Sequence, residues 1–149
     1  MQGFKSPHYK KGEKNMEFHM DHYAISVSNA EVSRQFYEKL GFQLIKDFQE
    51  RPDTVRILQM EKEGFLLEMF CYPDCKPTPE FVNDLTTDLK VNGAKHMALS
   101  VENLTLAAEY LIKNGLIRKM PVINEGRLGR PYFFMKDPDG IFIELIQCR

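Results

Sequence analysis

The sequence predicts an α+β fold made of two tandem modules, each with the element order βαβββ. The first observation is an internal repeat, because the segment from His22 to Gly41 recurs 74 positions later with seven of its twenty positions identical. The repeated residues in the first copy are His22, Ala24, Ser26, Val27, Asn29, Lys39 and Gly41. A repeated segment usually folds as one supersecondary unit and packs on its copy. The chain is therefore expected to contain two similar halves.

The second observation is a hydrophobic strand that carries a glutamate in each half. The segment FLLEMF at residues 65–70 resembles IFIELI at residues 141–146, with a small change of spacing. Each half thus has a histidine that opens its first strand, His22 or His96, and a glutamate within its last strand, Glu68 or Glu144.

The elements of the first half follow from residue type and spacing. Residues 18–27 are rich in β-branched and aromatic side chains, which predicts a strand. Asn29 suits a helix N-cap, apolar residues then recur at helical spacing, and Gly41 suits the position after the helix. Turn residues divide the following segment into three strands. These strands are expected over residues 42–50, 54–61 and 64–71.

The second half repeats this order, with Asn103 and Gly115 bounding its helix. Its later strands are expected over residues 120–124, 131–136 and 141–147, with the turn Asp137-Pro138-Asp139-Gly140 before the last one. Residues 18–149 are interpreted as a single domain. Its halves cover residues 18–72 and 94–148, and a proline-containing linker with a possible short helix at 81–89 covers residues 73–93. The polar, basic residues 1–17 are interpreted as a disordered leader or an expression remnant.

Composition favours one compact domain with a hydrophobic core, since 43% of the 149 residues are hydrophobic and the formal net charge is −1. This balance points to neither a nucleic-acid partner nor a membrane surface. The three cysteines are an odd number and are interpreted as free thiols in a cytoplasmic protein.

The two histidines and two glutamates are the candidate functional residues. A glutamate within an apolar strand is costly to bury unless it is paired, protonated or bound to a metal. A lone histidine or glutamate in a strand is most often structural. Here, pseudo-twofold packing of the halves would bring equivalent positions towards one axis, so we expect a metal centre formed by His22, Glu68, His96 and Glu144.

Five segments of the chain resemble the vicinal-oxygen-chelate superfamily, which includes glyoxalase I, extradiol dioxygenases, methylmalonyl-CoA epimerase, and fosfomycin and bleomycin resistance proteins. The segments are HYAISV (22–27), FYEKLGF (36–42), FLLEMF (65–70), KHMALSVEN (95–103) and FFMKDPDGIFIELI (133–146). The resemblance implies that the two modules form an open, cup-like barrel around one divalent metal ion.

The same resemblance implies a glyoxalase I type of enzyme, a lactoylglutathione lyase-like lyase/isomerase. The His-Glu-His-Glu ligand set of bacterial glyoxalases maps onto His22, Glu68, His96 and Glu144, whereas the dioxygenases usually lack a ligand at position 68. These ligands suit zinc, nickel, manganese or iron. By resemblance, the reaction isomerises a thiol hemithioacetal or a related vicinal-oxygen substrate through a metal-bound enediolate. Glu144 is then the expected base and Glu68 a second proton carrier.

Basic residues beside the last strands are candidates for holding an anionic tail of a small-molecule substrate. Arg130 is preferred because it enters a strand next to the glutamate strand, Arg127 and Lys136 follow, and Arg56 is a weaker candidate. Phe133 and Phe134 are expected in the core.

Two other functions remain open on sequence alone. One is a non-haem iron dioxygenase that uses His22, His96 and Glu144, and the other is a metal-free module that binds a drug or another ligand. The metal, the substrate and its thiol are also open. So is the choice between a site within one chain and a site shared across a homodimer.

Overall fold

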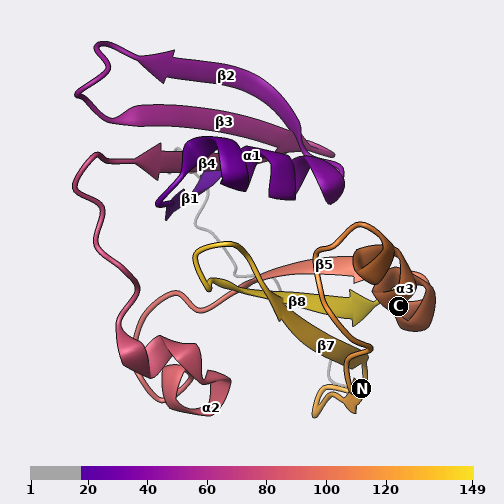
Figure 1. Cartoon of the computed structure of the whole chain (residues 1–149). Coiled ribbons are helices and arrows are strands. Elements are labelled where there is room, and N and C mark those ends of the chain that lie inside the picture. Colours follow the sequence, from indigo (N-terminus) through magenta and orange to yellow (C-terminus); the bar gives the residue numbers. More distant parts are fainter. Residues whose placement is uncertain (1–17) are drawn as a thin grey trace, which may run out of the picture.

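The computed structural model describes residues 18–149, which form two separate four-stranded sheets (Figure 1). The elements of the N-terminal half are β1 (His22–Ser26), α1 (Ala30–Lys39), β2 (Gln43–Gln49), β3 (Arg56–Lys62) and β4 (Phe65–Cys71). The strand order of this sheet is β1-β4-β3-β2. Strand β1 runs parallel to β4, and the other neighbours are antiparallel. The expected leader at residues 1–17 lies outside the described residues.

The C-terminal half repeats this arrangement. Its elements are β5 (Met97–Val101), α3 (Leu104–Lys113), β6 (Asn124–Glu125), β7 (Pro131–Lys136) and β8 (Phe142–Gln147). The strand order is β5-β8-β7-β6, with β5 parallel to β8. The prediction of an α+β fold with two βαβββ modules is therefore confirmed. Within the chain, the two sheets do not close into a single barrel.

The linker between the halves contains a short 3₁₀ helix, η1 (Glu80–Asn83), and one helical turn, α2 (Leu85–Asp88). The sequence predicts one helix across this segment, but Asp84 has extended backbone and interrupts it. Its side chain accepts a hydrogen bond from the Thr87 backbone, so Asp84 acts as an N-cap and starts α2 anew. No helix in the described part of the chain is long and apolar enough to cross a membrane.

The two long helices begin and end at the residues that the sequence indicates. The side chain of Asn29 caps α1 by accepting from the backbone of Glu31 and Val32, and Asn103 caps α3 in the same way through Leu106. Gly41 and Gly115 follow the helices with φ angles of 91° and 72°, which glycine adopts without steric cost.

Two predicted strands are wrong in extent. Strand β6 covers only Asn124–Glu125, because Pro121 cannot donate a ladder hydrogen bond and the Val122 side chain is 78% exposed. Strand β1 starts at His22 instead of Phe18, which is 91% exposed. β-Branched and aromatic residues alone therefore overstate strand length where no neighbouring strand pairs with them.

Each sheet has one face covered by its own helix. Helix α1 packs on β2, β3 and β4, and α3 packs on β7 and β8. The covered faces supply most of the core, including Leu58, Met60, Leu67, Met69, Phe133, Met135, Ile143 and Leu145. The opposite face of each sheet, here called its open face, carries Glu68 in the first sheet and Glu144 in the second.

The turn from Asp137 to Gly140 joins the two halves, which its Pro and Gly content does not reveal. The Tyr37 hydroxyl of α1 donates to the Asp137 carboxylate at 3.0 Å, and the Ser28 backbone N–H donates to the Asp139 carboxylate at 3.1 Å. Asp137 is 5% exposed, and burial raises the pKa of its carboxyl. Burial also raises the pKa of the Tyr37 hydroxyl, so Tyr37 remains a donor at neutral pH.

We predict that Tyr37→Phe lowers the free energy of unfolding by about 1–2 kcal/mol, because it leaves a buried carboxylate without its tyrosine donor. Urea denaturation at neutral pH measures this loss. Tyr110→Phe is the matched control: its hydroxyl also crosses between the halves, to the Lys39 carbonyl, but Tyr110 is half-exposed. The control should lose less than about 0.5 kcal/mol. Equal losses in the two variants would contradict the importance of the buried contact.

Candidate metal centre

The first histidine and glutamate meet through the parallel pairing of β1 with β4. Ala24 lies beside Glu68 in this pairing, so His22, two residues earlier, shares the open face with that glutamate. The His22 Nε2 atom lies 4.0 Å from a carboxylate oxygen of Glu68. The Glu68 side chain is 15% exposed, so the pair is open to solvent mainly on the histidine side.

The second histidine and glutamate are placed in the same way. Ala98 of β5 lies beside Glu144 of β8, and His96 comes immediately before β5. The His96 Nε2 atom lies 3.3 Å from a Glu144 carboxylate oxygen. The repeat in the sequence therefore becomes two equivalent half-sites, each with one imidazole and one carboxylate.

The two half-sites do not meet within one chain. Among residues 18–149, no group of three or more His, Cys, Asp or Glu side chains is arranged to hold a metal ion. Glu68 lines a cavity of about 190 Å³ with Lys46, Phe48, Ile57 and Gln59. Glu144 lines a different cavity of about 550 Å³, and the two cavities share no residue.

The His22 imidazole has two acidic neighbours. Its Nδ1 atom is 2.7 Å from an Asp21 carboxylate oxygen, and this hydrogen bond raises the pKa of the ring. Partial desolvation of the ring opposes this rise in pKa, and the negative charges of Glu68 and Asp21 add to it. Each ring nitrogen of His22 therefore faces a carboxylate: Nδ1 faces Asp21 and Nε2 faces Glu68.

The His96 imidazole is held by an aromatic ring instead. Phe134 meets it edge to face, with ring centroids 4.9 Å apart. Phe134 lies beside Glu144 on the open face, whereas its neighbour Phe133 is buried under α3. The expectation that both rings lie in the core is correct for Phe133 and wrong for Phe134. Strand alternation alone could have separated them.

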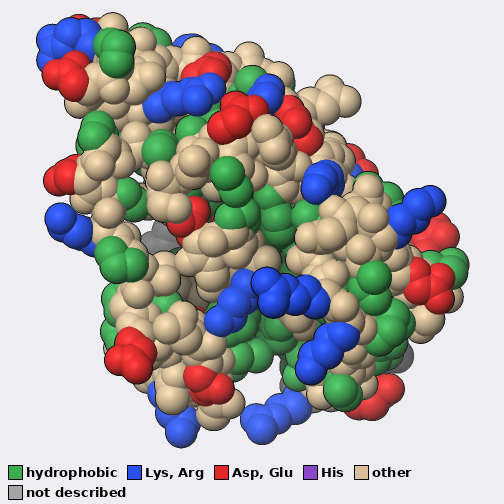
Figure 2. Space-filling model, in the orientation of Figure 1, with side chains coloured by type: hydrophobic (Ala, Val, Ile, Leu, Met, Phe, Trp, Pro, Cys, Tyr) green, Lys and Arg blue, Asp and Glu red, His purple; other side chains and the backbone are tan. Residues whose placement is uncertain are grey.

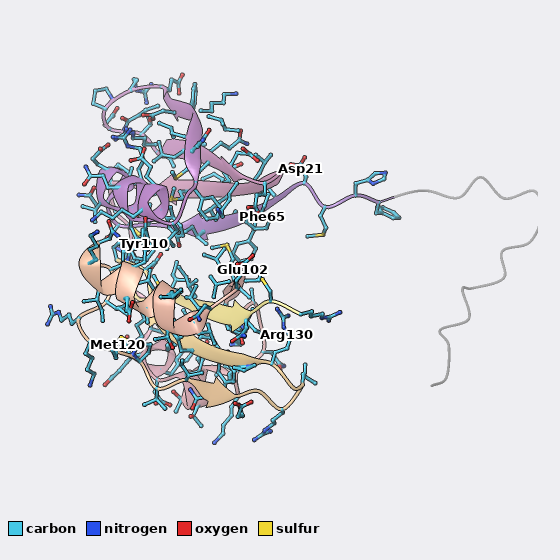
Figure 3. All side chains as sticks on the ribbon, turned by 90° about the vertical axis from the view of Figure 1, so that its right-hand side faces the viewer. Asp21, Phe65, Glu102, Tyr110, Met120 and Arg130 are labelled. Carbon is cyan, nitrogen blue, oxygen red and sulfur yellow. The ribbon has the colours of Figure 1, made fainter. Side chains whose placement is uncertain are left out.

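Three arginines line the 550 Å³ cavity beside Glu144: Arg127, Arg130 and Arg149. None of them forms an ion pair with another described residue, and Arg130 donates through Nε and Nη2 to the Gln147 carbonyl. Figure 3 shows Arg130 and Asp21 on the side of the molecule away from Tyr110 of α3. Arg149 was not among the substrate-binding residues expected from the sequence, because its position in the sequence does not indicate that it lies near Glu144.

Two other basic candidates lie elsewhere. Lys136 is on the open face, but its amine donates to the Asn83 carbonyl at 2.7 Å and lies 4.8 Å from the centre of the Phe142 ring. Arg56 is on the covered face and donates twice to Asp47, at 2.9 and 2.6 Å. Arg56 is therefore not available to a substrate beside Glu68. Figure 2 shows Lys and Arg side chains on the surface of the C-terminal half.

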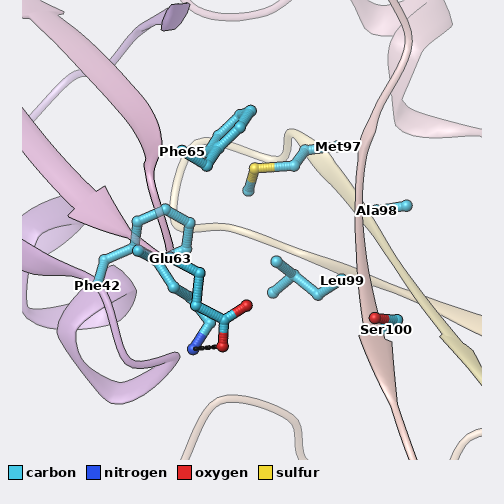
Figure 4. A pocket seen from close by; sticks show the side chains of 8 residues that line it. Phe42, Glu63, Phe65, Met97, Ala98, Leu99 and Ser100 are labelled. Atoms are coloured by element: carbon cyan, nitrogen blue, oxygen red, sulfur yellow. Dashed lines mark ion pairs between the residues drawn. The ribbon is translucent and has the colours of Figure 1, made fainter. Parts of the chain in front are cut away.

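A separate cavity of about 310 Å³ lies between the halves (Figure 4). Phe42 and Phe65 line it from the first half, and residues 97–100 line it from β5. Lys62 and Glu63 form an ion pair there at 3.9 Å. The cavity includes neither histidine of the half-sites.

Comparison with known proteins identifies the class. The sequence profile of the Glyoxalase/Bleomycin resistance protein/Dioxygenase superfamily matches residues 19–145, and the chain belongs to this superfamily. Glyoxylase I 4 of Arabidopsis thaliana is 23% identical over 132 residues, which cover 87% of this chain and 70% of that protein.

Solved structures share the fold. The glyoxalase family protein from Enterococcus faecalis matches with a TM-score of 0.70 and 25% identity, over 86% of this chain and 96% of that one. The trypanothione-dependent glyoxalase I of Leishmania major matches with a TM-score of 0.63 and 21% identity, over 88% of this chain and 87% of that one.

We predict that Phe134→Ala lowers the free energy of unfolding of the metal-free protein by about 2–3 kcal/mol, because it removes a half-buried ring that contacts three others. Phe81→Ala is the control, since Phe81 lies in the linker, is 47% exposed and has no ring contact among the described residues. It should lose less than about 1 kcal/mol. The role of Phe134 would be refuted by urea denaturation curves that shift equally for both variants.

Proposed function

We propose that this protein is a divalent-metal-dependent lyase/isomerase of glyoxalase I type, and that its metal centre forms between two copies of the chain. The observation that carries the proposal is the equivalent placement of two His–Glu pairs on open sheet faces, each with an imidazole Nε2 beside a carboxylate oxygen. Membership of a superfamily that includes glyoxalases supports the reaction class.

The donor types in the half-sites fit a divalent ion. Imidazole nitrogen and carboxylate oxygen suit zinc, nickel, manganese or iron. Ligating histidines commonly donate their other ring N–H to a carboxylate, as the Asp21–His22 contact allows. One half-site supplies only two protein ligands, so His22 and Glu68 of one copy would act with His96 and Glu144 of another.

The edges of the sheets favour such an assembly. Strands β1 and β5 are both edge strands, and unpaired edges in native proteins are usually covered. Their open-face residues after the histidines are small and exposed: Ala24, Ser26, Ala98 and Ser100. A symmetric dimer that joins β1 of each copy to the β5 side of the other would create two identical sites.

The bound ion would supply Lewis-acid stabilisation to two adjacent substrate oxygens. In the proposed reaction, Glu144 takes the proton from the hemithioacetal carbon and returns it to the neighbouring carbonyl carbon. The product is the thioester of a 2-hydroxy acid, an isomer of the substrate, so no other reactant is needed. Glu68 would approach the same carbons from the opposite side as a second proton carrier.

The proposed substrate carries negative charge. Arg127, Arg130 and Arg149 surround the cavity at Glu144 without an acidic partner among the described residues. The aromatic side chains of Tyr132 and Phe134 share that open face. An adduct of a small dicarbonyl compound with a carboxylate-bearing thiol fits this combination, with Lys136 further along the face as a weaker contact.

We predict that the native protein binds about one divalent ion per chain, and that two inactive variants restore binding in a mixed dimer. The variants are His22→Ala with Glu68→Gln, and His96→Ala with Glu144→Gln. Each alone lacks half of every site. A mixed dimer, co-expressed and purified through two histidine-free tags, contains one intact and one fully disrupted site, so elemental analysis should find about half an ion per chain.

Binding that stays absent in the mixed dimer, while both variants remain folded and dimeric by circular dichroism and light scattering, would overturn the shared site. No ion in the native protein after soaking with zinc, nickel, manganese and iron would overturn the metal-dependent function and favour a ligand-binding module. Activity that needs iron and oxygen and survives Glu68→Gln would identify a dioxygenase instead.

We predict that Arg127→Ala combined with Arg149→Ala raises KM for methylglyoxal with a carboxylate-bearing thiol about tenfold and leaves kcat nearly unchanged, because these residues would hold the tail of the substrate and not the reacting carbons. Arg118→Ala, which removes an exposed positive charge beyond α3, is the control. A KM equal to that of the native protein, or a similar change with a neutral thiol, would argue against the anion site.

A further inference from the structure

The residues that precede the two histidines have opposite charges. Asp21 comes before His22, and Lys95 occupies the equivalent position before His96. The two copies of the repeat therefore differ in charge immediately before each proposed ligand. The two half-sites are therefore supported differently.

Asp21 accepts a hydrogen bond from the His22 ring. Its carboxylate oxygen lies 2.7 Å from Nδ1, and Nε2 faces Glu68. A neutral imidazole has one N–H and one lone pair, so a proton on Nδ1 leaves the lone pair on Nε2. That is the tautomer in which Nε2 can bind a metal ion. Asp21 lies just before β1, so strand alternation does not direct it to the opposite face.

Lys95 gives no such support to His96. Its amine turns to Asp88, which is 5% exposed, at 3.0 Å. The Nδ1 atom of His96 is buried and has no hydrogen-bond partner among the described residues. The His96 ring is held in place by its edge-to-face contact with Phe134. Packing thus restricts the direction of this ring, whereas the Glu144 carboxylate, 3.3 Å from Nε2, favours a proton on that nitrogen in the metal-free protein.

We propose that Asp21 is a positioning residue that holds His22 as the Nδ1–H tautomer with Nε2 directed towards Glu68. In the metal centre proposed above, on which this inference rests, Asp21 makes His22 the ligand that is oriented before the ion arrives. Loss of such a carboxylate typically weakens metal binding 10- to 100-fold. His96 adopts its binding tautomer only when the ion selects it.

The experiment compares Asp21→Ala and Asp21→Asn with the native protein. Zinc affinity, measured by competition with a chelator, should fall about 10- to 100-fold for Asp21→Ala. Asp21→Asn keeps an acceptor oxygen and should recover part of the loss. Asp53→Asn removes the same charge from an exposed pair with Arg51, in the turn between β2 and β3, and should leave the affinity unchanged.

A second measurement is made without metal. Nitrogen-15 NMR of the metal-free protein, at a pH where the rings are neutral, reports which nitrogen of each histidine carries the proton. We expect the Nδ1–H tautomer for His22 in the native protein and a mixture in Asp21→Ala. The spectrum of His96 should be the same in both proteins.

The outcomes separate this inference from the proposed function. Native zinc affinity and an unchanged His22 tautomer in Asp21→Ala would overturn the role of Asp21 while leaving the metal centre intact. A native protein that binds no metal would refute the proposed function. The tautomer measurement would still decide whether Asp21 orients His22.

Discussion

Parallel pairing of the first and last strands in each half is the constraint on which the candidate site depends. It places Ala24 beside Glu68 and Ala98 beside Glu144, so that the histidine two residues earlier shares a face with the glutamate. A shift of one residue in either register would move the glutamate to the covered face, where it would meet the apolar underside of a helix. The register of each sheet therefore decides whether its histidine and glutamate share a face.

Within the chain, the two halves are joined where α1 contacts the turn at Asp137. The open faces of the two sheets do not meet there. Two partly buried carboxylates therefore remain on faces that also expose apolar groups. A bound cation would compensate the negative charge of the carboxylates, and a second chain would cover the exposed strand edges. Under this arrangement, metal affinity depends on protein concentration, because dissociation of the dimer separates the ligands.

The sequence predicted the features that depend on local chemistry or on the repeat. Asn29 and Asn103 act as caps, Gly41 and Gly115 end the helices, and the module order is correct. Features that depend on contacts between distant segments were missed. Asp137 accepts a hydrogen bond from Tyr37, 100 residues away, Arg149 lines the Glu144 cavity, and β6 covers only two residues. Phe134 was expected in the core because it is aromatic, but residue type does not distinguish the two faces of a strand, and Phe134 lies on the open face.

The self-contained sheet of the first half has a consequence for the order in which the molecule is made. All four strands of that sheet are present once Cys71 has left the ribosome, before any strand of the second half has emerged from it. The first half can then form its backbone pairing without waiting for the second, as expected for units that fold during translation. Until Asp137 and Asp139 arrive, its contacts through Tyr37 and Ser28 are unmade. A nascent first half therefore exposes its joining surface to chaperones and to other newly made chains.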